Sequence, residues 1–196
     1  MLDMLEFDAA THTYRLNGQI LPSVTQVLGP LTDLSMIPPA ILERKRLIGQ
    51  WVHAAIELDL KDDLDEESIG EDWRGYFMGW RKFRTESGFV VHENEQRVHS
   101  KKYGYAGTLD LTGELPKLGL SLIDTKCTAT IYPAVGPQTA AYAEARGLKK
   151  PKRFALQLKP NGTFNLHPCD DRGDLGVFMA ALTLHNWRKR NGTASD

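Results

Sequence analysis

The sequence predicts an α/β protein built on a central mixed sheet flanked by helices. A long helical pattern is followed along the chain by three strand patterns, another helix and further strands. That order of elements is typical of a sheet sandwiched between helices. At 196 residues, with 41% hydrophobic and 25% charged residues, the chain suits one domain with a buried core. We expect one domain over 1–196, comprising an N-terminal hairpin and short helix (1–35), a helical region (36–90) and a sheet-bearing core (91–190).

Turn signals and hydrophobic spacing place the individual elements. Asn17-Gly18 is a strong two-residue hairpin signal, Ser23 can cap a helix, and Gly88 and Gly147 each end one. The acidic stretch 59–72 is expected to be a solvated linker. In order, the predicted elements are strands at 12–16 and 19–21, a helix from 23 to 27 or 28, a helix opened by Pro38-Pro39 and running to 60, a helix over 73–87, strands at 89–99, 105–112 and 119–126, a helix over 133–146, strands at 153–158 and 163–167, and a helix over 170–190.

Composition excludes several classes of protein. A formal net charge of −1 argues against binding polyanions by bulk charge, although acids gathered at one site can offset basic residues elsewhere. Two cysteines, Cys127 and Cys169, are too few for a four-cysteine zinc or iron–sulfur site. No run reaches the ~18 apolar residues of a membrane span, and the acidic N-terminus is unlike a secretory or transit peptide. We therefore expect a cytoplasmic protein with no membrane partner.

Two predicted strands, 105–112 and 119–126, each carry an acid within an apolar or β-branched run. These acids are Asp110 in GTLDL and Asp124 in LIDTK. Because side chains alternate along a strand, Asp124 and Lys126 share one face, and antiparallel pairing would put Asp110 beside Asp124. Two adjacent carboxylates repel each other, and a divalent cation relieves that repulsion. A structural ion-pair network is the alternative, but a lone lysine beside two buried acids favours a hydrolytic metal site.

Five motifs follow one another along the chain: Tyr14…Gly18 with LPSVTQVL (21–28), Gly49-x-x-x-His53, GTLDL with Asp110, LIDTK with Asp124 and Lys126, and Gln138-x-x-x-Tyr142. Together they resemble one known family, the RecB-like branch of the PD-(D/E)XK nucleases. The resemblance covers most of the chain and includes a segment similar to phage nucleases and mitochondrial genome maintenance exonucleases. It implies a restriction-endonuclease-like core, and the absence of four cysteines implies a relative without an iron–sulfur cluster.

The resemblance also implies roles for individual residues. His53, Asp110, Asp124 and the carbonyl of Thr125 would hold Mg²⁺ or Mn²⁺. Lys126 would orient the attacking water or stabilise charge on the phosphate. Without the motif, His53 would more often be a surface or core histidine. The other residues that it assigns to catalysis are Glu95, Gln138, which would steady the lysine or a metal-bound water, and Tyr142, which would face the substrate.

Several assignments stay open at this point. Glu93 shares a strand face with Glu95, although Glu95 is preferred, and Glu57 is either a partner of the histidine or a solvent-facing acid. Ser23 and Thr25 could bind a backbone phosphate, and helix capping explains Ser23 equally well. Trp51 or Tyr132 could stack on single-stranded bases. Four basic runs could contact DNA, and the sequence does not choose among them: 44–46, 101–102, 149–153 and 188–190.

The function that follows is a metal-dependent DNA exonuclease acting on single-stranded or duplex ends and leaving 5′-phosphates. The implied setting is phage or bacterial DNA recombination, repair or processing, with a single-strand annealing or binding protein as a candidate partner. The alternatives are a structure-specific endonuclease and a non-catalytic DNA-end-binding accessory protein.

Overall fold

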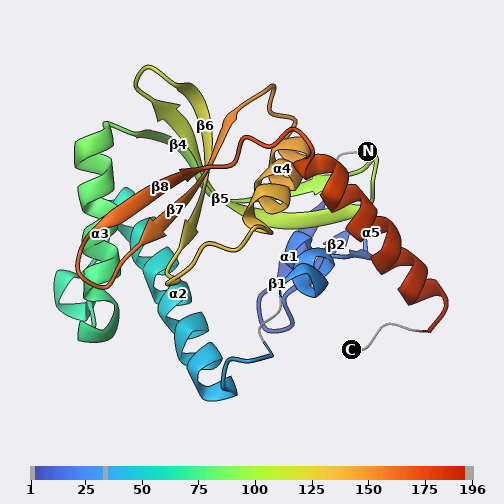
Figure 1. Ribbon diagram of the computed structural model, residues 1–196, viewed down its shortest axis with the longest axis horizontal. Coiled ribbons are helices and arrows are strands. Elements are labelled where there is room, and N and C mark those ends of the chain that lie inside the picture. Colours follow the sequence, from blue (N-terminus) through green and yellow to red (C-terminus); the bar gives the residue numbers. More distant parts are fainter. Residues whose placement is uncertain (1–2, 33–34, 193–196) are drawn as a thin grey trace.

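A five-stranded mixed sheet lies at the centre of the protein, whose structure, a computed structural model, describes residues 3–32 and 35–192 (Figure 1). Its strands follow the spatial order β4-β5-β6-β7-β8, and all neighbours are antiparallel except β6 and β7. Those two are parallel because helix α4 crosses between them. The predicted α/β class is confirmed. The strands are β4 (Val90–Ser100), β5 (Tyr105–Leu115), β6 (Gly119–Lys126), β7 (Lys152–Leu158) and β8 (Phe164–Pro168).

Helices cover both faces of this sheet, as Figure 1 shows. Helices α2 (Pro39–Leu60) and α3 (Glu71–Ser87) pack on one face. Helices α1 (Val24–Leu28), α4 (Val135–Arg146) and α5 (Asp174–Arg190) pack on the other. Each face therefore has its own hydrophobic cluster, and the sheet separates the two.

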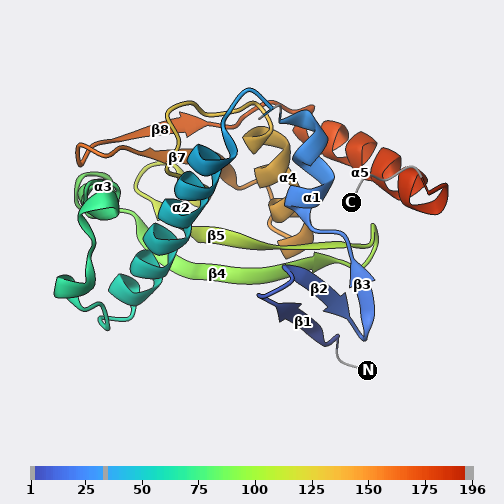
Figure 2. The ribbon, with the colours of Figure 1, turned by 90° about the horizontal axis from the view of Figure 1, so that it is seen from below.

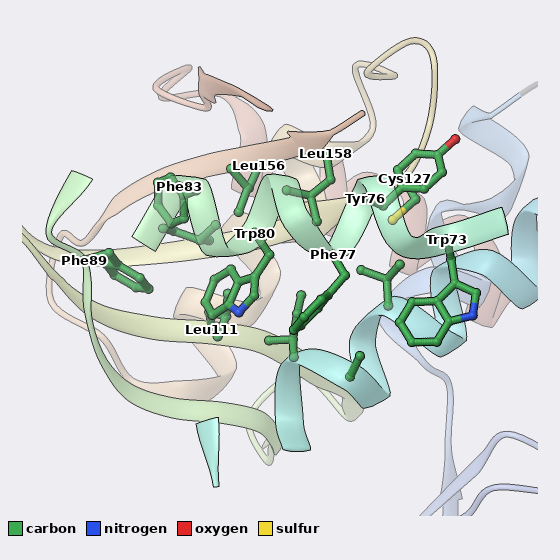
Figure 3. Close-up of a cluster of buried hydrophobic side chains, with 14 of the residues drawn as sticks. Trp73, Tyr76, Phe77, Trp80, Phe83, Phe89, Leu111, Cys127, Leu156 and Leu158 are labelled. Atoms are coloured by element: carbon green, nitrogen blue, oxygen red, sulfur yellow. The ribbon is translucent and has the colours of Figure 1, made fainter. Parts of the chain in front are cut away.

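The first cluster depends on a row of aromatic side chains along α3. Trp73, Phe77 and Trp80 recur every three or four residues and are buried, so they lie on one side of the helix. In Figure 3 this row points toward the sheet, where Leu111 and Leu156 meet it. Fully burying a side chain of this size is worth about 1.5–3 kcal/mol. The row fixes α3, and with it α2, against the sheet.

Strand alternation explains how the second cluster forms from the same strands. Ile123 packs in the first cluster, whereas its neighbour Leu122 packs in the second. Tyr105 belongs to the second cluster and packs edge-on against Phe178 of α5, with 4.7 Å between ring centroids. The face that carries Leu122 also carries Asp124, so this alternation directs the acid toward α4.

A second, three-stranded sheet precedes α1, where the sequence predicted only a hairpin. The additional strand β1 (Leu5–Asp8) pairs antiparallel with β2 (Thr13–Leu16), which pairs with β3 (Gln19–Leu21). Phe7 lies opposite Tyr14 in this pairing. The strand was missed because it has only two apolar positions between acids. Figure 2 shows this sheet beside one end of β4 and β5.

Other differences from the prediction concern where elements begin and end. The stretch 59–72 is not one solvated linker. Asp59 lies in the last turn of α2 and forms an ion pair with Arg81 at 2.8 Å, and residues 66–68 form a 3-10 helix. Strand β5 runs three residues beyond 112, and α5 begins four residues after 170. The parts of the ranges 1–35 and 1–196 that fall on residues 1–2, 33–34 and 193–196 lie outside the described residues. Among the helices that the structure describes, none has the length and apolar character needed to cross a membrane.

Candidate active site

Strands β5 and β6 separate at the middle of the sheet, and the two predicted acids lie at this point. Their antiparallel pairing ends at Leu111 and Ile123, so Asp110 and Asp124 come next on each strand. The ladder does not continue, because the backbone N–H of Thr125 donates to Asp110 Oδ2 at 2.6 Å. A side-chain carboxylate thus replaces a backbone carbonyl as acceptor. Asp110 and Asp124 therefore follow the last paired residues of the two strands, and the charge of Asp110 raises the pKa of Asp124.

Lys126 ion pairs with the second of these acids. Its Nζ lies 2.6 Å from Asp124 Oδ2, while the Asp124 side chain is only 1% exposed and that of Lys126 is 26% exposed. Asp124 Oδ1 is buried and has no hydrogen-bond partner within the described part of the chain. Burial raises the pKa of Asp124 to about 6, with the charge of Asp110 adding to the rise and that of Lys126 opposing it. One carboxylate oxygen is therefore available for a further ligand.

Helix α2 supplies an imidazole to the opening between β5 and β6. His53 Nδ1 lies 2.8 Å from Glu95 Oε1, and its Nε2 lies 3.4 Å from the Thr125 carbonyl oxygen and 3.7 Å from Asp110 Oδ2. Burial lowers the pKa of His53, but the charge of Asp110 and the hydrogen bond and charge of Glu95 outweigh it and raise that pKa to about 9. Burial raises the pKa of Asp110, and the positive charge of His53 opposes that rise. The charged imidazole therefore offsets the negative charge of Glu95 and Asp110. Among the ion pairs of the described residues, Lys126 is the other cation beside these acids.

Of the two glutamates that the sequence left open, Glu95 is the one at this opening. A bulge between Val91 and Glu93 shifts the register of β4, and Glu95 has a φ of +48°, which is uncommon for a non-glycine residue. Glu93 instead accepts hydrogen bonds from Thr112 and Arg146. Strained backbone of this kind often marks a functional position.

Gln138 and Tyr142 form a wall beside the acids. Gln138 Nε2 donates to the Tyr142 hydroxyl at 3.3 Å, so the two residues contact one another along α4. Tyr142 is buried, and burial raises the pKa of its hydroxyl well above the usual range, as does the charge of Asp124. Gly107 permits this packing, because a Cβ there would lie 2.7 Å from Tyr142 Cε1. Both residues line a small cavity that also reaches Asp110 and Lys126.

The donor atoms at the opening suit a hard divalent cation. His53, Glu95 and Asp110 each offer one ligand atom, and these atoms lie within 4.8 Å of one another. The Thr125 carbonyl oxygen lies 3.4 Å from His53 Nε2, whereas Asp124, a predicted ligand, is not among the residues that meet the 4.8 Å distance within the described chain. A set dominated by carboxylate and carbonyl oxygens fits Mg²⁺ or Mn²⁺. The sequence predicted a catalytic role for Glu95. In the structure its carboxylate also lies close enough to the donor atoms of His53 and Asp110 to bind the same metal ion.

A larger cavity of about 570 Å³ opens on the α2 side, and one of the four basic runs, 44–46, contributes to its lining. Lys45 and Arg46 line it together with Gln50, His53 and Lys126. Lys45 precedes His53 by eight residues, and this spacing puts both on one face of a helix. The helical spacing from His53 could therefore have identified Lys45 as the candidate DNA contact among the four basic runs.

The structure also decides two smaller alternatives. Glu57 Oε1 accepts from Lys61 Nζ at 2.6 Å, and it is Glu95 that bonds the imidazole Nδ1. Ser23 is buried and forms a capping box with Gln26, so capping accounts for it. Thr25 is exposed and lines the small cavity.

The protein shows only remote structural likeness to known proteins. No protein-family model matches the sequence, and no curated protein matches it either. The solved structures that resemble the fold include two of the alkaline exonuclease LHK-Exo from Laribacter hongkongensis. One has a TM-score of 0.37 and 12% identity, covering 87% of this chain and 92% of that chain. The other, in complex with dAMP, has a TM-score of 0.33 and 15% identity, covering 88% of this chain and 93% of that chain.

Proposed function

We propose that this chain is a divalent-metal-dependent deoxyribonuclease that degrades DNA from its ends. The observation that carries the proposal is the meeting of Asp110 and Asp124 where β5 and β6 separate, with Lys126 2.6 Å from Asp124. Taking carboxylates out of water costs several kcal/mol even when they are paired, and such groups are typical of sites that hold a cation or do chemistry. The motif resemblance to RecB-like nucleases supports the same assignment, and it alone favours action at ends.

Each residue of the site has a role that follows from its contacts. His53, Glu95, Asp110, Asp124 and the Thr125 carbonyl would hold Mg²⁺ or Mn²⁺. When bound, such an ion lowers the pKa of a coordinated water and neutralises charge on the phosphate. Asp124 holds the Lys126 ammonium at the opening. A compact ammonium there can contact a phosphoryl oxygen as negative charge develops.

Gln138 and Tyr142 would act from α4. The Gln138 amide donates to the Tyr142 hydroxyl, and both side chains border the cavity that contains Lys126. We assign Gln138 to positioning the lysine or an attacking water, and Tyr142 to shaping the substrate side of the cavity. The product would carry a 5′-phosphate. The biological setting that fits is cytoplasmic DNA recombination, repair or processing in a bacterium or a phage-infected cell, with a single-strand annealing or binding protein as the protein partner to test.

End-labelled single-stranded and duplex DNA, linear or circular, incubated with Mg²⁺ or with chelator, tests this proposal. We expect linear DNA to shorten with Mg²⁺ and circular DNA to stay whole. Cleavage of circular or blocked DNA at junctions would instead indicate a structure-specific endonuclease. Binding to ends without cleavage in Mg²⁺ or Mn²⁺ would indicate a DNA-end-binding accessory protein, and the nuclease proposal would then be wrong.

A further inference from the structure

Two cavities open on the candidate site from opposite sides. The larger, of about 570 Å³, is bounded by α2, and the smaller, of about 290 Å³, is bounded by the N-terminal sheet, α1 and α4. Glu95 and Lys126 line both of them. A polynucleotide whose scissile phosphate lay at the acids would therefore extend into both cavities, one on each side of that phosphate.

The two linings differ in chemistry. Lys45 and Arg46 give the α2-side cavity a cationic wall, which suits a sugar–phosphate backbone. The smaller cavity has an aromatic wall from the N-terminal sheet instead. Phe7, His12 and Tyr14 pack together there, with centroid distances of 4.6 Å for Phe7 to Tyr14 and 5.3 Å for Phe7 to His12. Aromatic faces of this kind bind nucleobases by stacking.

The members of this aromatic wall have separate tasks. Tyr14 is buried, and its hydroxyl lies 2.8 Å from Thr108 Oγ1, so it supports the wall. Phe7 is half-buried and His12 is exposed, so neither side chain is fully covered. The Arg97 guanidinium lies 5.3 Å from the Phe7 ring centroid and restricts that ring. Phe7 and His12 are thus the residues that a base would contact.

The smaller cavity has room for one nucleotide. Its volume of about 290 Å³ lies at the lower limit, roughly 300 Å³, of pockets that take small molecules. This size matches a single nucleotide rather than a duplex. It therefore suits the last nucleotide of a strand.

We infer that the cavity bounded by the N-terminal sheet holds the terminal nucleotide of a single-stranded DNA end, with its base against Phe7 and His12. The rest of the strand leaves over α2, past Lys45 and Arg46. This inference rests on the proposed nuclease function and adds which side of the site receives the end. It makes the N-terminal sheet the part of the protein that recognises a free terminus.

Binding measured with chelator present, so that no DNA is cleaved, tests the inference. The probes are single-stranded oligonucleotides of about 12 nucleotides, within the usual site sizes, with all bases intact or with one abasic nucleotide at the 5′ end, the 3′ end or the centre. We expect the abasic nucleotide at one end to weaken binding at least about fivefold, the lower range for loss of one stacked base. The central abasic nucleotide should weaken it by less than about twofold.

Variants distinguish stacking from a general loss of affinity. Phe7→Leu keeps an apolar side chain but lacks a flat ring, so it should abolish the difference between the terminal abasic and intact probes, and Phe7→Trp should keep it. His12→Asn, which tolerates the positive φ of 49° at that position, should reduce the difference. Lys45→Gln should weaken binding of all probes by a similar factor and leave the difference intact.

The outcomes separate this inference from the proposed function. Equal binding of intact and both terminal abasic probes by the wild type, or an undiminished difference in Phe7→Leu, overturns the inference even if the protein degrades linear DNA. A terminal difference that Phe7→Leu removes, in a protein that cleaves nothing with Mg²⁺ or Mn²⁺, supports the pocket and overturns the nuclease. Absence of measurable binding to every probe overturns the inference and removes its basis.

Discussion

Lys126 connects the buried acids of the site to the solvent-accessible cavities. Burial lowers the pKa of its ammonium, but the charges of Asp124 and Asp110 outweigh burial and raise that pKa above its usual value. The side chain therefore remains charged across the physiological range. Since it is also partly exposed, it can contact a ligand as well as Asp124.

Replacing this lysine should separate catalysis from binding. We expect Lys126→Ala to lower kcat for linear DNA by about 10²–10³-fold, the usual loss when one preorganised electrostatic contact to the transition state is removed. DNA affinity should stay within about twofold, because Lys45 and Arg46 remain to contact phosphates. Lys61→Ala is the matched control, since Lys61 is exposed and pairs only with Glu57 among the ion pairs of the described residues. A Lys126→Ala enzyme with wild-type kcat would show that our assignment of this residue is wrong.

Asp110 offers a test of metal binding that needs no DNA. In the folded protein it accepts the Thr125 N–H, and an asparagine Oδ1 can accept the same hydrogen bond. At a hundredfold excess over its Kd, Mg²⁺ stabilises a protein by about 2.7 kcal/mol, or roughly 5–10 °C in Tm for a chain of this size. We expect this rise for the wild type and less than about a third of it for Asp110→Asn, measured by thermal melting.

The exposed acid Asp72 supplies the control for this measurement. It pairs with Arg44 at 2.9 Å at the start of α3, away from the opening between β5 and β6. Asp72→Asn should therefore keep the full Mg²⁺-dependent rise in Tm. An equal rise in Asp110→Asn would place the metal elsewhere in the protein.

At the scale of elements, the contact between α3 and the turn that joins β7 to β8 has little tolerance. A Cβ at Gly75 would lie 1.7 Å from the backbone oxygen of Pro160, and a backbone atom cannot move aside cheaply. This contact holds the β7–β8 hairpin against the helix that carries the aromatic row. It also fixes the far edge of the sheet whose centre bears the site.

Gly75→Ala should lower the free energy of unfolding by about 1–3 kcal/mol or more, because the extra methyl group overpacks this contact. Gly176→Ala is the control, since nothing lies within 4 Å of a Cβ at that position of α5. Alanine favours the helix over glycine by roughly 0.5–1 kcal/mol, so the control should be slightly stabilised. Urea unfolding of both variants gives the comparison. A neutral Gly75→Ala would mean that the hairpin can shift without loss.

Elements and site differ in how far the sequence determines them. The strands of Asp110 and Asp124 were predictable because alternation and the turn between them are local features. Two features were not predictable, namely the strand at Leu5–Asp8, whose partner supplies its stability, and the contact of His53 with Glu95. That contact depends on how α2 crosses β4 and on a positive φ within a strand. No residue pattern near Glu95 predicts the crossing of α2 over β4 or the positive φ.

At the scale of the whole molecule, β6 joins the two hydrophobic clusters. Leu122 and Ile123 are adjacent in the chain yet belong to different clusters, so disrupting one cluster disturbs the strand on which the other depends. The expectation of a single domain over 1–196 can therefore be tested by unfolding. Both clusters should unfold in one cooperative transition.

Tryptophan fluorescence can test this coupling in a Trp187→Phe background, because Trp187 lies on α5 with Phe178. Trp73 and Trp80 are buried in the first cluster, whereas Phe178 is buried in the second. Phe178→Ala should lower the free energy of unfolding by about 3–5 kcal/mol through the cavity that it leaves. If the clusters unfold together, this change moves the urea midpoint seen by fluorescence and by far-UV circular dichroism by the same amount. A fluorescence midpoint that stays at the wild-type value while the dichroism transition splits would show two separately folding parts. The site, which draws His53 from one side of the sheet and Tyr142 from the other, could then be assembled only while both parts are folded.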